Sequence, residues 1–233
     1  ADGLAAVLPS TTCDLKMRII NADGSEAEMC GNAVRCVSRY AQTAGLARGS
    51  SLKIETLAGE IHTEQVGDGV RVDMGRPILD AAEIPVANES GHVLKKHIVV
   101  DDEHFVVCAV SMGNPHAVLY AGELTDELVL GFGKLLQTHP DFPRRANVEF
   151  VKVEKEDEIT MRVYERGVGE TLACGTGACA GVVAGVLNGR HGTRVTVHLR
   201  GGDLVVEWDG DETHSVFLTG PTQRVFHGTV GLE

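Results

Sequence analysis

The sequence lacks several patterns that would assign it to a common protein class. It has no Cys-x-x-Cys pair, which gives zinc-ribbon and thioredoxin-like sites little support. Its six cysteines are too sparse in 233 residues to form a disulfide scaffold. The N-terminus has neither a basic region nor a sustained apolar run, and the least charged window, 171–188, is slightly short for a membrane span. We therefore expect no signal peptide and a buried helix in that window.

Positive charge is also scarce. The formal net charge is -12, which argues against nucleic acid or an anionic membrane as the main partner. An acidic surface does not exclude a small anionic substrate, because a binding site can be locally positive. With 43% hydrophobic residues the chain can supply a core. The composition predicts a soluble, acidic cytoplasmic protein, and the cysteine spacing predicts no metal site.

One stretch, YERGVGETLACGTGACAGVVAGVL at 164–187, organises the rest of the chain. A turn rich in charge and glycine leads to Cys174 and then to a segment of small apolar residues. A helix of this composition has no polar face and is expected to be packed on all sides. At a helix N-terminus, unpaired N–H groups and the macrodipole stabilise a thiolate or a bound carboxylate. The sequence thus predicts a lowered pKa for Cys174.

A second copy of this arrangement lies 144 residues earlier, at Cys30. The match continues downstream: AGEI at 58 corresponds to GGDL at 201, and MGRP at 74 to LTGP at 218, at offsets of 143 and 144. Three correspondences at nearly one spacing predict two copies of one domain. Only 29 residues precede Cys30, so the first copy is expected to lack several tens of residues at its N-terminus.

The hydrophobic pattern is mostly that of strands. Alternating runs predict strands in both copies, among them 52–56, 60–66 and 70–74, and helices are predicted at 33–44, at 125–139 and after Cys174. We place the boundary at Gly75-Arg76-Pro77. The first domain then covers 1–75, with a closing strand at 221–233 returning to it, and the second covers 76–220.

Paired cysteines at helix starts have a chemical use. If one thiolate removes the α-proton of an amino acid and the other thiol returns a proton on the opposite face, the centre inverts. Helix-start N–H groups would stabilise the charge that develops beside the carboxylate. This is racemase or epimerase chemistry without a cofactor. The other cysteines lack this context and are interpreted as structural: Cys13, Cys36, Cys108 and Cys179.

At these residues the sequence resembles diaminopimelate epimerase. NADGSEAEMCGN and YERGVGETLACGTG resemble the two cysteine signatures of that family, and GNPHAV at 113–118 resembles a third. The resemblance covers essentially the whole chain. It implies a cofactor-independent epimerase that interconverts LL- and meso-diaminopimelate for lysine and peptidoglycan precursors. It also implies an α/β (α+β) fold of two pseudo-symmetric domains, each a mixed, mainly antiparallel sheet or barrel around a buried helix, and a homodimer.

The resemblance also implies roles for individual residues. Cys30 and Cys174 match the paired acid and base, which exchange roles with reaction direction. His116 and Glu165 match residues beside the cysteines that tune their pKa values. The remaining positions match substrate-binding residues: Asn21, Gly31, Asn32, Asn114, Asn147, Glu165, Arg166, Gly175 and Thr176. An arginine can clamp a carboxylate, and asparagine or glutamate oxygens can receive an ammonium group.

One departure and four rivals remain at this point. The family has a substrate-binding stretch near its N-terminus that is absent here, so we expect weak or no activity from this polypeptide alone. Proline racemase-like and hydroxyproline epimerase-like enzymes also use two cysteines, and a phenazine-biosynthesis-type isomerase shares the architecture without them. From another class, a redox-responsive binding protein would join Cys30 and Cys174 in a disulfide. Solvent deuterium uptake at the α-position of LL-diaminopimelate separates an epimerase from the redox-responsive protein, which would show no exchange.

Overall fold

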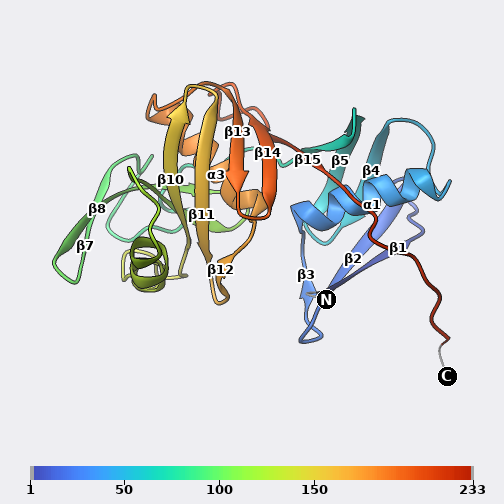
Figure 1. Ribbon diagram of the computed structural model, residues 1–233, viewed down its shortest axis with the longest axis horizontal. Helices are drawn as coiled ribbons and strands as arrows, with labels where there is room; N and C mark the ends of the chain where they lie inside the picture. Colours follow the sequence, from blue (N-terminus) through green and yellow to red (C-terminus); the bar gives the residue numbers. More distant parts are fainter. Residues whose placement is uncertain (1–2, 232–233) are drawn as a thin grey trace. The chain divides into compact units, whose positions relative to one another are not determined.

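Alternating burial along most segments shows why this sequence forms sheets. Strand β2 (Leu15–Asn21) buries Leu15, Met17 and Ile19 on one face, which is the two-residue period of a half-buried strand. The computed structural model describes residues 3–231 and divides into two units, 3–72 with 220–231, and 73–219 (Figure 1). Each is described by itself.

The first unit is a six-stranded sheet beside one helix. Its elements are β1 (Gly3–Leu8), β2, β3 (Glu26–Ala27), α1 (Gly31–Thr43), β4 (Ser51–Thr56), β5 (Gly59–Val66) and β6 (Gly69–Asp73). The strand order is β1-β2-β4-β5-β6, with β3 paired to β2. Only the β2–β4 pair is parallel, which α1 makes possible by crossing between these strands. Its core includes Ile54 and Val34.

The second unit contains the same series and adds three strands and two short helical segments before it. The added elements are β7 (Lys96–Val100), β8 (Glu103–Ser111), β9 (Pro115–Tyr120), the π-helix η1 (Glu127–Phe132) and α2 (Gly133–Leu136). The repeated series is β10 (Asn147–Lys155), β11 (Glu158–Glu165), β12 (Gly169–Thr171), α3 (Gly175–Leu187), β13 (Arg194–Leu199), β14 (Gly202–Glu207) and β15 (Phe217–Pro221).

Strand pairing confirms the internal repeat. The β10–β11, β11–β12, β13–β14 and β14–β15 pairs are antiparallel and β11–β13 is parallel. The corresponding pairs of the first unit, from β1–β2 to β5–β6, have the same directions in the same order. The predicted α/β fold with few helices and a mixed, mainly antiparallel sheet is therefore confirmed.

The two repeated helices differ in burial. Helix α3 contacts β8, β9, β10, β11 and β14, and ten of its thirteen residues are buried (Figure 1). Helix α1 buries only six of thirteen, and Tyr40 is 51% exposed. The expected fully buried helix thus holds for α3 only. The reason is local, since α1 carries polar residues such as Arg39 and Thr43 at helical spacing.

Other differences concern single segments. The closing strand predicted at 221–233 is not formed, because β15 ends at Pro221 and no backbone ladder continues through 222–231; residues 232–233 lie outside the described residues. A segment without a partner strand has no acceptors for its N–H groups and takes irregular structure. The helix expected at 125–139 is η1 followed by α2. Within residues 3–231, no helix is long and apolar enough to span a bilayer.

Candidate active site

Cys174 is the residue at which chain direction changes from β12 to α3. It has extended dihedrals, φ -127° and ψ 115°, while its carbonyl already accepts the N–H of Ala178 at 2.9 Å. Its Sγ accepts the N–H of Gly177 at 3.4 Å and lies 3.4 Å from Oγ1 of Thr176. The thiol therefore caps the helix in the way a serine or aspartate oxygen does.

Burial decides the ionisation of this thiol. Cys174 is 8% exposed, and burial raises its pKa to about 12, with the charges of Glu165 and Glu149 adding to the effect. The helix start acts in the opposite direction, but that contribution is only about 1 kcal/mol. The expectation of a lowered pKa for Cys174 is therefore wrong, because sequence position at a helix start does not reveal desolvation or neighbouring carboxylates. At rest, Cys174 is a thiol.

A buried hydrogen-bonded chain lies beside Cys174. His116 on β9 and Glu149 on β10 are both fully buried, and Nδ1 of His116 is 2.7 Å from Oε1 of Glu149. The other ring nitrogen, Nε2, is 3.0 Å from Oδ1 of Asn114. Oε2 of Glu149 has no hydrogen-bond partner among the described residues. The chain runs from Glu149 through His116 to Asn114.

Burial raises the pKa of Glu149, more than the nearby His116 lowers it. With Glu149 protonated, its O–H donates to Nδ1, and Nε2–H donates to Asn114. Each contact then has one donor and one acceptor, and the amide N–H₂ of Asn114 is left to bind a ligand. The arrangement fixes both the histidine tautomer and the orientation of Asn114.

Gly177 allows α3 to approach Glu149 closely. A Cβ at this position would lie 2.7 Å from Oε1 of Glu149 and 3.3 Å from Sγ of Cys174. The absence of a side chain at 177 therefore lets the buried carboxyl and the thiol share one small space. This explains part of the small-residue pattern of the helix in terms of the site.

The Glu165–Arg166 pair follows β11 in a tight turn. Gly167 and Gly169 have φ values of 79° and 103°, which only glycine adopts readily. Glu165 accepts a hydrogen bond from Oγ1 of Thr171, and the backbone N–H of Arg166 donates to Oδ1 of Asn147 at 2.8 Å. The guanidinium of Arg166 is exposed and donates to a loop carbonyl at 3.3 Å.

The buried Asn147 therefore holds this turn in place. Its own amide donates to the carbonyl of Pro115 at 3.3 Å, which ties β10 to the start of β9. Asn147 is 3% exposed, so in this structure its amide positions backbone.

The first unit presents Cys30 with the same backbone geometry as Cys174, although the Cys30 side chain makes no capping hydrogen bond. Its dihedrals are φ -145° and ψ 115°, and its carbonyl accepts the N–H of Val34 at 3.0 Å. Gly31 begins α1, and Oδ1 of Asn32 accepts a hydrogen bond from Arg35 at 2.9 Å. Asn21 ends β2 in an exposed turn, where its amide donates to Ser25 at 3.0 Å. Cys30 and Cys174 are both free thiols.

The second unit thus gathers most of the predicted site residues around one thiol. Lying at or near Cys174 are Asn114, His116, Asn147, Glu165, Arg166, Gly175 and Thr176, whereas Asn21, Cys30, Gly31 and Asn32 belong to the first unit. Sequence reasoning missed Glu149 and Gly177. A signal for Glu149 was present, because a lone carboxylate alternates with Val148 and Phe150 in a strand of otherwise buried residues.

Metal ligands are not clustered in the part of the chain that the structure describes: no group of three or more His, Cys, Asp or Glu side chains could hold an ion there. The residues near Cys174 instead offer a thiol, a buried acid–histidine pair, amides and the N–H groups of a helix start. These groups can move a proton and stabilise an anion.

Comparison with known proteins gives the family. A sequence model of diaminopimelate epimerase matches residues 1–79 and 108–225. The chain is 52% identical over 232 residues to the diaminopimelate epimerase of Desulforudis audaxviator (strain MP104C), covering 98% of this chain and 83% of the relative. It is 50% identical over 238 residues to that of Moorella thermoacetica (strain ATCC 39073 / JCM 9320), covering 100% and 85%.

Solved structures with the same fold are more distant in sequence. A hydroxyproline epimerase from Agrobacterium vitis has a TM-score of 0.69 at 17% identity, covering 94% of this chain and 72% of that one. A phenazine biosynthesis protein of the PhzF family from Bacillus anthracis has a TM-score of 0.65 at 15% identity, covering 94% and 81%. The fold is shared with these enzymes, and the sequence matches over nearly the whole chain show that the protein belongs to the diaminopimelate epimerase family of isomerases.

Proposed function

We propose that this protein interconverts LL- and meso-diaminopimelate by moving protons between the substrate α-carbon and two cysteines, Cys30 and Cys174. The observation that carries the proposal is their equivalent placement. Each cysteine occupies the N-cap position of a thirteen-residue helix with extended dihedrals, at the same point of two repeats with the same strand pairing. One such cysteine would suit many roles, whereas a matched pair suits inversion, which needs a proton acceptor and a proton donor.

The proton transfers balance. One cysteine acts as thiolate and takes the α-proton, the electron pair stays on the α-carbon next to the carboxylate, and the other thiol protonates the opposite face. The two cysteines end with exchanged protonation states, so the next turnover in the same direction requires proton exchange with water. No oxidant, reductant or external group is needed.

The raised pKa of Cys174 assigns the starting roles. Because burial and two carboxylates hold this side chain as the thiol, Cys174 serves as the first proton donor. Cys30 then serves as the base in that direction. Glu165 favours the thiol of Cys174 electrostatically, which is how the proposed tuning role of this residue would operate.

Substrate recognition is proposed to combine helix starts with amides and one ion pair. The first N–H groups of a helix have no intrahelical acceptors, so Gly31-Asn32 and Gly175-Thr176 can bind the carboxylate at the reacting centre. The exposed guanidinium of Arg166 suits the distal carboxylate, and Glu165 suits an ammonium group. The amides of Asn21, Asn114 and Asn147 complete the set.

Solvent isotope exchange on the intact protein tests this function. In D₂O, LL-diaminopimelate should gain one deuterium at one α-carbon and form meso product, whereas L-proline should remain unlabelled. Cys30→Ala and Cys174→Ala should each abolish inversion, and Cys36→Ala, which removes an exposed thiol outside the site, should leave it unchanged. Inversion that survives either of the first two substitutions would overturn the two-cysteine mechanism, and labelling of proline in place of diaminopimelate would overturn the substrate assignment.

The homodimer stays a prediction. Light scattering of the purified protein at several concentrations measures its mass directly.

A further inference from the structure

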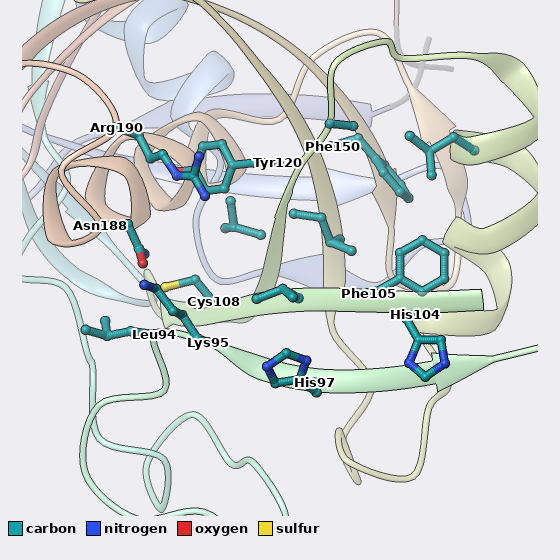
Figure 2. A pocket seen from close by; sticks show the side chains of 15 residues that line it. Leu94, Lys95, His97, His104, Phe105, Cys108, Tyr120, Phe150, Asn188 and Arg190 are labelled. Atoms are coloured by element: carbon teal, nitrogen blue, oxygen red, sulfur yellow. The ribbon is translucent and has the colours of Figure 1, made fainter. Parts of the chain in front are cut away.

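A second hollow in the same unit lies away from Cys174, at the opposite end of α3. It has a volume of about 560 Å³ and forms where β7, β8 and β9 extend past the last turn of the helix (Figure 2). A thirteen-residue helix is about 20 Å long, so this hollow and Cys174 are separated by about that distance. The volume falls within the range of small-molecule sites, which runs from about 300 to 1,000 Å³.

The ionisable groups around this hollow are unusual for an acidic protein. Apart from the thiol of Cys108 and the phenol of Tyr120, every ionisable side chain that lines the hollow is basic. These side chains are Lys95, His97, His104 and Arg190. The chain as a whole has a net charge of -12, yet no Asp or Glu lines this hollow. Among the described residues, none of these four side chains has an ion pair, whereas the adjacent Lys96 is paired with Glu89 and Asp141. Positive charge is therefore available here for a ligand.

The floor of the hollow is apolar. Cys108 and Val118 are paired across β8 and β9, and the fully buried Phe150 also lines the hollow. Phe105 lines the far end, where its ring packs against Phe132 at 5.0 Å. A ligand that fills this space needs a hydrophobic body as well as an anionic group.

The polar side chains gather at one end of the hollow. Figure 2 shows Lys95, Asn188 and Arg190 on one side, with His104 and Phe105 at the other. The guanidinium of Arg190 lies 5.1 Å from the centroid of the Tyr120 ring, which orients it over an aromatic surface. A planar guanidinium and an ammonium at the same end of one hollow can both bind an anion.

Two features oppose an anion at this place. The C-terminus of a helix carries partial negative charge. In α3 the last carbonyls are already bonded: Asn188 Nδ2 donates to Ala184 O at 2.9 Å, and Arg190 N donates to Gly185 O at 2.8 Å. Acidic residues also occupy the β7–β8 turn, but Asp101, where that turn begins, is six residues from Lys95, about 20 Å at strand rise. The two full positive charges of Lys95 and Arg190 therefore outweigh the partial negative charge of the helix C-terminus and the more distant acidic turn.

We propose that this hollow is a binding site for a small amphipathic anion, with its carboxylate or phosphate group held by Lys95 and Arg190 and its apolar body on the floor formed by Cys108, Val118 and Phe150. The site is separate from the substrate site and does not depend on the proposed epimerase mechanism.

Calorimetric titration of the intact protein tests the proposal with four probes. Phenyl phosphate and benzoate carry an anion on an apolar body, inorganic phosphate lacks the body, and benzyl alcohol lacks the charge. Phenyl phosphate or benzoate should bind saturably, and at least tenfold more tightly than inorganic phosphate or benzyl alcohol. Whichever of the two binds more tightly identifies the preferred anionic group.

Matched variants locate the binding. Lys95→Gln with Arg190→Gln should weaken binding at least tenfold. Lys155→Gln with Arg194→Gln removes the same charge from exposed, carboxylate-paired positions outside the lining and should leave affinity within about twofold. Both double variants replace exposed side chains and should melt close to the wild-type temperature. The proposal is overturned if no anionic probe binds at about 10 mM. It is also overturned if inorganic phosphate binds as tightly as phenyl phosphate, or if the two double variants bind the probes with equal affinity.

Discussion

Nδ1 of His116 lies 2.7 Å from Oε1 of Glu149, and neither side chain is exposed to solvent. Glu149 also contacts the space that Gly177 leaves open beside the Cys174 thiol. Burial without solvent disfavours the ionised form of this carboxyl group, because a carboxylate loses its hydration there. Its behaviour with pH follows from the raised pKa.

Glu149→Gln should change stability in a pH-dependent way. The folded-state pKa is raised above the ordinary value of 4.5, so the wild-type residue stabilises most below that value and progressively less as pH rises. Glutamine resembles the protonated acid, so Glu149→Gln should gain stability relative to wild type as pH rises above 4.5, until the pH passes the folded-state pKa of Glu149. Urea denaturation from pH 5 to pH 8 measures this. Glu127→Gln, at an exposed position, should show a flat difference, and a flat difference for Glu149→Gln as well would contradict the protonated assignment.

Glu170→Gln should show the opposite pH dependence. Two hydrogen bonds from Arg162, at 2.7 and 3.0 Å, hold the pKa of Glu170 below its ordinary value despite partial burial. Its contribution is present above pH 4.5 and is lost as pH falls further. The substitution should therefore cost about 1–3 kcal/mol at pH 7 and much less at pH 3, measured by denaturation midpoints.

The matched control uses the same arginine. Asp126 also accepts from Arg162 but is 78% exposed, so Asp126→Asn should have almost no effect. Equal losses at both positions would show that burial does not determine the strength of these ion pairs.

Gly177→Ala should damage the site although alanine favours helices. The added methyl would meet Oε1 of Glu149 at 2.7 Å, and neither the helix nor the buried pair has room to move. We expect a loss of about 1–3 kcal/mol and a slower epimerase reaction.

Gly181→Ala, one turn further along α3, is the control. Its methyl would meet the flexible Met161 sulfur at 3.2 Å, and the helix-propensity gain of up to about 1 kcal/mol should offset that contact. Thermal unfolding of both variants decides the matter. If alanine at 181 is as harmful as at 177, general crowding of α3 rather than contact with Glu149 is responsible.

Alkylation by iodoacetamide should discriminate among the thiols. With a pKa of about 12 and 8% exposure, Cys174 has about one thiolate in 10⁴ molecules at pH 8. Peptide mapping by mass spectrometry should find it modified far more slowly than the exposed Cys36, with a rate that climbs up to at least pH 10. If Cys174 reacted as fast as Cys36 at pH 7, its pKa would not be raised, and the lowered pKa expected for a helix start would be supported.

Local pattern was sufficient to predict much of the fold. The alternation in 52–56, 60–66 and 70–74 predicted three strands that the structure contains as β4, β5 and β6. The repeat offsets also predicted that Cys30 and Cys174 occupy equivalent helix starts. These features depend on neighbours in sequence, which a single chain displays directly.

Features that depend on distant segments were not predictable. β1 and the π-helix η1 were not anticipated, and the segment 222–231 has no ladder although its pattern resembles a strand. The pKa of Cys174 was predicted in the wrong direction, because β10 and β11 bring Glu149 and Glu165 to the thiol only after folding. The role of Glu149 was not predictable from local pattern, because its partner His116 lies 33 positions away.

Helices α1 and α3 differ in burial, so we expect the helix that carries Cys30 to be less rigid than the helix that carries Cys174. Ten of thirteen residues of α3 are buried, against six of thirteen in α1. Amide protons of α3 should therefore exchange with solvent deuterium mainly through large-scale opening, and those of α1 through smaller local fluctuations. Cys174 would then keep its position during the proposed reaction, and Cys30 would move to fit each stereoisomer.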